Sequence, residues 1–129
     1  MNDFYIDEKQ TKKFYQNYND RCNCLYCENY YKYIEEEYPY LKEYLSKFNI
    51  DILKPIEVME YPLNEDKSLY EVFYAVCGNL SKEYKEKVKD LFIEFMNKEV
   101  LYKINNIDNY FLVRVSEIKL RKPIEDKEE

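Results

Sequence analysis

Residues 69–77, LYEVFYAVC, carry apolar side chains on both faces of an extended chain. Because side chains alternate along a strand, one face holds Tyr70, Val72, Tyr74 and Val76, and the other holds Leu69, Phe73, Ala75 and Cys77. A strand that is apolar on both faces needs cover on both sides, which a position inside a sheet provides. The sequence therefore predicts a central strand over 69–77, ended by Gly78 and Asn79, with other layers packed around it.

Two other segments have the period of a strand. Residues 56–61 precede a polar turn, NED at 64–66, which connects them to the central strand. Residues 110–118, YFLVRVSEI, place Phe111, Val113 and Val115 on one face. Both segments are expected to be strands of the same small sheet.

Residues 82–96 fit more than one period. Tyr84 and Val88 are spaced for a helix that Ser81 could cap, whereas Leu91, Ile93 and Phe95 alternate as in a strand. We expect a short helix over 82–90 and a strand over 91–96.

Two helices are expected before the strands. From Cys24 to about Tyr38 the apolar residues recur at steps of three and four, with Asn23 placed to cap the first turn. Pro39 breaks this pattern because it disfavours helical backbone at the preceding residue. A second helix follows from Tyr40 to about Asn49.

This order of elements predicts an α+β fold, with N-terminal helices packed on a small, mostly antiparallel sheet of about four strands. We expect a partly ordered lead-in over 1–20 and a single domain over 21–120. A charged, solvated tail is expected over 121–129.

The chain has no histidine and one glycine, Gly78, and these two absences exclude many kinds of active site. Histidine is the most used general base, and glycine-rich loops hold phosphates and dinucleotides. Serine–histidine and cysteine–histidine designs, P-loops and dinucleotide-binding motifs are all excluded. We therefore expect a protein that is not an enzyme.

Charge and hydropathy limit the partners. The net charge is −6, from 26 acidic and 20 basic residues, and neither half of the chain is basic, which argues against nucleic acid. No apolar run approaches the roughly 20 residues that cross a bilayer, and the start, MNDFYIDEKQ, lacks the pattern of a signal peptide. The expectation is a cytoplasmic protein without a membrane partner, in which the thiols stay reduced.

Three of the four cysteines, Cys22, Cys24 and Cys27, lie within six residues. Thiolates are good zinc ligands, and Cys-x-x-Cys has the spacing of one half of a zinc site. The fourth cysteine, Cys77, lies 50 residues further on in the predicted central strand and is a weaker candidate for the fourth ligand. Other candidates are carboxylates such as Asp20 or Glu28, or a second chain. Two alternatives stay open: cysteines packed as small apolar side chains, and thiols that act in redox chemistry.

The stretches CNCLYCENY and NIDILKPIEVMEY, followed by a strand that ends in Val-Cys-Gly, carry a resemblance. Over roughly residues 20–118 the chain resembles a group of small uncharacterised bacterial proteins with a Cys-x-Cys-x-x-Cys-x-Asn-Tyr motif. The matching positions are Cys22, Cys24, Cys27, Asn29 and Tyr30. The resemblance supports the α+β layout and implies no activity.

Two functions are expected from these observations. The first is a non-catalytic protein-interaction domain without a cofactor, such as an inhibitor or immunity-type protein, whose acidic and tyrosine-rich surface meets a protein partner or a second copy of the chain. The alternative is a small zinc-binding protein that uses Cys22, Cys24 and Cys27.

Overall fold

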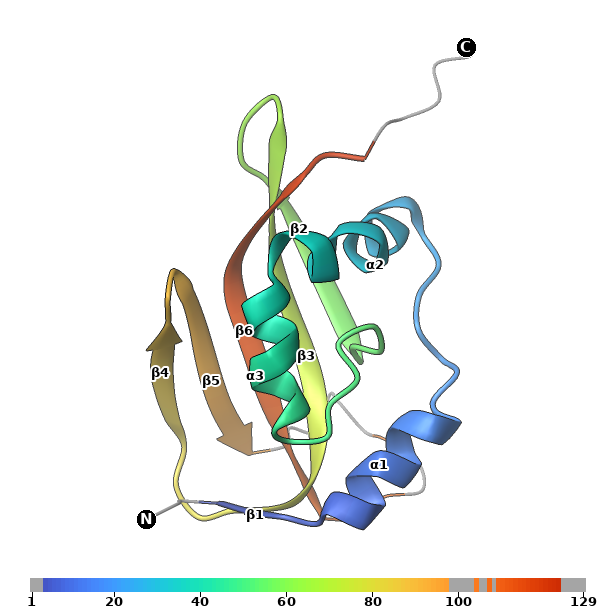
Figure 1. The fold of residues 1–129 in the computed structure, drawn as a ribbon, viewed down its shortest axis with the longest axis vertical. Coiled ribbons are helices and arrows are strands. Elements are labelled where there is room, and N and C mark those ends of the chain that lie inside the picture. Colours follow the sequence, from blue (N-terminus) through green and yellow to red (C-terminus); the bar gives the residue numbers. More distant parts are fainter. Residues whose placement is uncertain (1–3, 98–103, 105–106, 108, 124–129) are drawn as a thin grey trace.

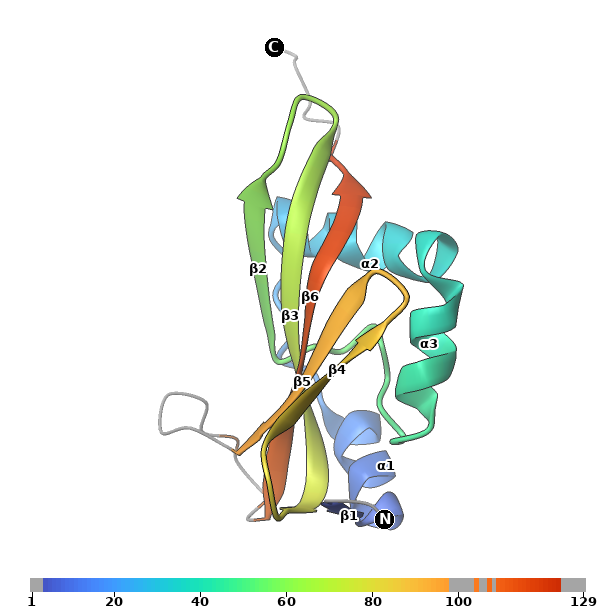
Figure 2. The same cartoon turned by 90° about the vertical axis from the view of Figure 1, so that its left-hand side faces the viewer.

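The computed structural model describes residues 4–97, 104, 107 and 109–123 of the 129-residue chain. Along the chain the elements are β1 (Phe4–Ile6), α1 (Glu8–Asn17), α2 (Leu25–Glu37), α3 (Pro39–Ser46), β2 (Glu57–Pro62), β3 (Lys67–Leu80), β4 (Tyr84–Val88), β5 (Leu91–Asn97) and β6 (Tyr110–Arg121). The helices lie together on one face of a curled antiparallel sheet (Figures 1 and 2), so the α+β class is confirmed. Within the described residues the sheet has six strands rather than about four.

Strand β3 is the central strand that the sequence predicts. It pairs antiparallel with β6 along one edge and with both β1 and β2 along the other. Its alternate residues Tyr70, Val72, Tyr74 and Val76 belong to the main core beneath the helices. On the opposite face Ala75 packs with Tyr110 and Leu112 of β6 in a smaller cluster, so both faces are covered as expected.

The expected helix over 82–90 is wrong, because residues 84–88 of this range form β4, which pairs with β5. Tyr84 and Val88 pack against the core, and the Tyr84 ring stacks on Phe95 with ring centroids 4.6 Å apart. A spacing of four residues keeps two side chains on one face in a helix and in a strand alike, so the pattern could not separate the two. The strand over 91–96 is confirmed as β5.

Residues 4–17 form β1 and α1, where the sequence suggested only a partly ordered lead-in. Helix α1 is polar and buries only Thr11 and Tyr15, so its apolar residues show no helical period from which the helix could be predicted. The Tyr15 hydroxyl donates to the Ala75 carbonyl at 2.6 Å and thereby fixes α1 on β3. At the other end of the chain β6 extends to Arg121, and the expected tail lies largely in 124–129, outside the described residues.

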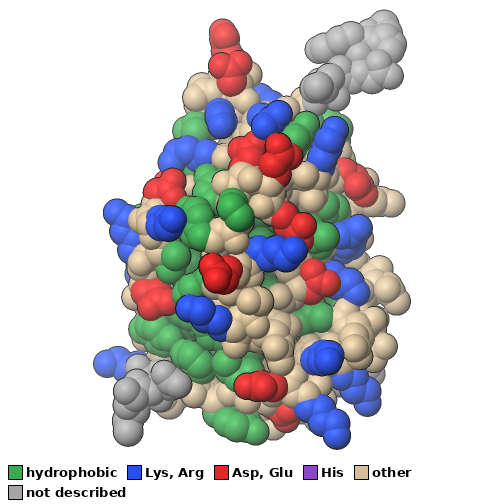
Figure 3. Space-filling view, viewed as in Figure 1, with side chains coloured by type: hydrophobic (Ala, Val, Ile, Leu, Met, Phe, Trp, Pro, Cys, Tyr) green, Lys and Arg blue, Asp and Glu red, His purple; other side chains and the backbone are tan. Residues whose placement is uncertain are grey.

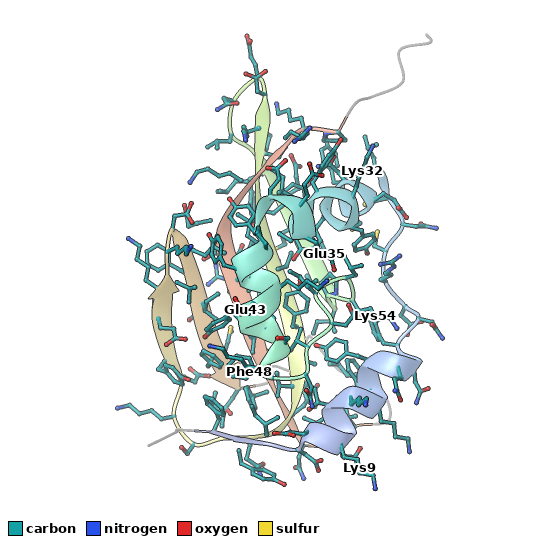
Figure 4. The ribbon with its side chains drawn as sticks, viewed as in Figure 1. Lys9, Lys32, Glu35, Glu43, Phe48 and Lys54 are labelled. Carbon is teal, nitrogen blue, oxygen red and sulfur yellow. The ribbon has the colours of Figure 1, made fainter. Side chains whose placement is uncertain are left out.

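The two predicted helices are present with small shifts at their ends. Cys24, not Asn23, is the N-cap residue of α2, and the side chain of Cys24 makes no capping hydrogen bond. Pro39 occupies the first turn of α3, where proline needs no backbone N–H. Phe48, which follows α3, points toward the sheet (Figure 4) and contacts Phe95 with ring centroids 5.5 Å apart. None of the described helices is long and apolar enough to cross a membrane.

Gly78 lies inside β3 rather than after it, and it is required there for two reasons. Its φ is +144°, which side-chain-bearing residues rarely adopt, and a Cβ at this position would lie 1.9 Å from the Tyr5 carbonyl oxygen of β1. We predict that Gly78→Ala lowers the free energy of unfolding by roughly 3 kcal/mol or more, measured by urea denaturation. Asn79→Ala, at the exposed neighbouring position, is the control and should change it by less than about 0.5 kcal/mol. Equal stability of the two variants would contradict this account of Gly78.

Candidate metal centre

The first half of α2 is fixed over the sheet by a buried polar contact. Asn29 is 5% exposed, and its amide donates to the Tyr70 hydroxyl at 3.1 Å and to the Arg121 carbonyl at 2.9 Å. The Tyr70 hydroxyl in turn donates to the Tyr26 carbonyl at 3.0 Å. These bonds join α2 to both β3 and β6, so they fix the position of its first turns on the sheet.

The three clustered cysteines come together at this helix start. Cys24 is the N-cap residue, Cys27 lies in the first turn, and Cys22 belongs to the segment before the helix. The three Sγ atoms all lie within 4.8 Å of one another. The backbone N–H of Cys24 donates to the Cys22 Sγ at 3.3 Å. Cys27 is buried, whereas Cys22 and Cys24 are exposed, so the cluster has one side in the protein and one side toward solvent.

The surroundings change the acidity of two of these thiols in opposite directions. The pKa of Cys24 is lowered, chiefly because the backbone N–H of Cys27 stabilises its thiolate, with a smaller contribution from the Cys22 side chain. Burial raises the pKa of Cys27, and the neighbouring Cys22 and Cys24 raise it further. In the absence of a metal ion Cys24 is therefore the readier thiolate and Cys27 stays protonated.

Two further residues hold the segment before α2 in place, and sequence reasoning did not identify their roles. The Tyr31 hydroxyl donates to the Cys22 carbonyl at 2.7 Å. The guanidinium of Arg21 lies 4.1 Å from the centre of the Tyr31 ring and donates to the Leu53 carbonyl at 2.8 Å. The only sequence signal was the position of Tyr31, four residues after Cys27 and therefore on the same side of the helix.

The fourth cysteine is not part of the cluster. The backbone N–H of Cys77 donates to the Thr11 Oγ1 at 3.0 Å, and its carbonyl accepts from the Asp7 N–H at 2.9 Å, so it lies beside α1. Along β3 it is seven residues beyond Tyr70, which contacts α2, and this corresponds to about 23 Å of extended chain. Among the described residues the cluster also includes no carboxylate, so Asp20 and Glu28 are not brought into it.

A groove of about 460 Å³ lies next to the cluster, between α2 and the residues that follow β6. Its lining includes Leu25, Tyr31, Lys32 and Pro123. Tyr31 thus contributes both to the groove and to the segment that carries Cys22. Lys32 lies on the outer side of α2 (Figure 4) and is exposed.

The arrangement is suited to a soft metal ion. A tetrahedral zinc ion with Zn–S bonds of about 2.3 Å holds its sulfur ligands about 3.8 Å apart, so sulfurs already within 4.8 Å need only a small adjustment. Thiolates favour zinc and copper(I) over the hard cations magnesium and calcium. Three thiolates fill three of the four tetrahedral positions.

We predict a clear order of thiol reactivity in the metal-free folded protein. At neutral pH Cys24 should be alkylated by iodoacetamide at least about tenfold faster than Cys27, because the thiolate is the reactive form and Cys27 is both buried and less acidic. Mass spectrometry of peptides from a timed reaction measures each rate. Cys77, which is also buried, serves as the slow reference. Equal rates at Cys24 and Cys27 would show that this geometry is not the one in solution.

Comparison with known proteins supplies no relative whose function could be transferred to this chain. No protein family, no curated protein and no solved structure matches it. The chemistry of the site is therefore argued from its own residues.

Proposed function

We propose that this chain is a small zinc-binding protein whose ligands are the thiolates of Cys22, Cys24 and Cys27. The observation that carries the proposal is the mutual distance of the three Sγ atoms, all within 4.8 Å, which belong to the first turn of α2, its N-cap residue and the segment before it. Cysteines that only pack in a core would not need two exposed members, and Cys22 and Cys24 are exposed.

The charges around the cluster favour a bound ion of this kind. Zinc with three thiolates has a net charge of −1, which positive groups nearby stabilise. The N-terminus of α2 supplies the positive end of a helix dipole. The guanidinium of Arg21 lies over Tyr31 beside the segment that carries Cys22.

Zinc at this site would also have a structural effect. It would link the segment between α1 and α2, through Cys22, to the first turn of α2, through Cys27. Because the ligands must be brought together for binding, the free energy of binding is also free energy of folding. The metal is thus expected to stabilise the helix start and the connection that leads to it.

The first test is the metal content of protein without a histidine tag, purified without chelator. We expect about one zinc per chain, and we expect chelation to lower the melting temperature because zinc binds the folded state. The double variant Cys24→Ser/Cys27→Ser should lose the zinc, because it leaves a single cluster thiol per chain. Cys77→Ser is the matched control, since Cys77 lies beside α1, and it should retain the zinc.

Two results would reject the proposal. One is wild-type protein that takes up no stoichiometric zinc when it is supplied in excess. The other is a Cys77→Ser variant that loses zinc as completely as the double variant does, because the ligands would then not be the clustered thiolates.

A non-catalytic protein-interaction domain of the inhibitor or immunity type is the second candidate. It is favoured by exposed apolar side chains at the end of β2, where Tyr61 is 46% and Leu63 is 44% exposed. Acidic and basic side chains are interspersed over the helix-covered face (Figure 3), so an acidic patch does not single out that face. Mixing the protein with basic nucleases at low ionic strength, where electrostatic attraction is strongest, tests this candidate. Absence of any complex there would count against it.

A further inference from the structure

The candidate metal centre is incomplete on its solvent side. Cys27 is 5% exposed and faces the protein, whereas Cys22 and Cys24 are exposed. Within the part of the chain that the structure describes, no further cysteine or carboxylate joins the three. A structural zinc site is closed by four protein ligands, and the exposed Cys22 and Cys24 leave the cluster open to a ligand that approaches from the solvent side.

We infer that a second copy of this chain closes the site, so that two copies hold two zinc ions through six thiolates; this inference rests on the proposed zinc-binding function. Two tetrahedral ions have eight coordination positions. Six thiolates fill all eight when two of them each bind both ions. One bridging thiolate from each copy satisfies this requirement under two-fold symmetry.

Burial decides which thiolates can form the bridge. A bridging sulfur must reach an ion that the partner also holds, so it must lie at the surface. Cys27 is buried and therefore binds only the ion on its own copy. The bridge comes from Cys22 or Cys24, both of which are exposed beside the helix start.

The surface around the cluster is suited to contact with its own copy. Leu25 follows Cys24 directly and is 45% exposed, which gives an apolar contact next to the thiolates. Arg21 and Glu28 have opposite charges and both lie near Tyr31: the Arg21 guanidinium is 4.1 Å from the centre of the Tyr31 ring, and Glu28 lines the groove together with Tyr31. A patch with both signs of charge can be complementary to itself across a two-fold axis, because each Arg21 can face a Glu28 of the partner.

The experiment is native mass spectrometry together with sedimentation velocity on tag-free wild-type protein, with zinc and with chelator. We expect a dimer with two zinc ions, and a monomer when the zinc is removed. The Cys22→Ser variant separates the models by stoichiometry. Four thiolates per dimer are enough for one tetrahedral ion, so this variant should form a dimer with one zinc. A monomeric site reduced to two thiolates would not retain the metal.

A pair of surface variants tests the contact itself. Leu25→Arg places two like charges across the two-fold axis and should weaken the zinc-loaded dimer at least about tenfold. Phe92→Arg, at a position of β5 that is similarly exposed at 44%, is the matched control and should dimerise like the wild type. Circular dichroism of both variants verifies that each is folded.

The outcomes distinguish the two proposals. A monomer that holds one zinc would overturn the shared site and leave the zinc-binding function standing. Protein without zinc at saturating metal would overturn both. A zinc-dependent dimer that Leu25→Arg and Phe92→Arg weaken equally would place the contact elsewhere and overturn this interface.

Discussion

Strand β3 hydrogen-bonds to three other strands and is buried on both faces, and helices α1 and α2 are each joined to it by a tyrosine hydroxyl. The Tyr15 hydroxyl of α1 bonds to the Ala75 carbonyl, and the Tyr30 hydroxyl of α2 bonds to that of Tyr74 at 2.5 Å. Burial raises the pKa of Tyr30 and Tyr74, so both stay neutral; because the Tyr74 hydroxyl donates to the Ile52 carbonyl, the Tyr30 hydroxyl donates to that of Tyr74. A buried hydroxyl without a partner costs about 1–3 kcal/mol, so these pairings also determine which packing is stable.

The candidate metal centre follows from the same strand. Tyr70 of β3 bonds to Asn29 and to the Tyr26 carbonyl, and these contacts hold the first turns of α2 at one end of the sheet. Cys27 is then fixed by the helix, because its position is part of the first turn. Cys22 is fixed separately, through the bond from Tyr31 to its carbonyl. The sulfur atoms are therefore brought together by contacts between α2 and the sheet and by a contact between α2 and the segment before it.

The parts of the fold that were predictable are those where one pattern has one structural meaning. The apolar run on both faces over 69–77 predicted an inner strand, which β3 is, whereas Tyr84 and Val88 have a spacing that a helix and a strand share. Strand β1 is three residues long and depends on pairing with β3, so its own residues carry almost no signal. For the site, the Cys24-x-x-Cys27 spacing predicted two thiols at a helix N-terminus, and the structure has Cys24 as the N-cap residue and Cys27 in the first turn of α2. Cys77 is separated from them by part of the length of β3. The residues next to each cysteine in the sequence do not indicate this distance.

The contrast between Cys27 and its two exposed neighbours governs the chemistry of the cluster. Helix α2 orders Cys27 whether or not an ion is bound, because the residue is packed in the core. Cys22 lies in a connection fixed mainly by Arg21 and Tyr31, so ordering it costs conformational entropy that few contacts offset. If an ion bound all three thiolates, part of its binding free energy would offset this entropy cost. Its apparent affinity would be lower by the same amount. In the proposed three-thiolate site, the contacts of Tyr31 and Arg21 with this connection would reduce that cost by ordering part of it before an ion binds.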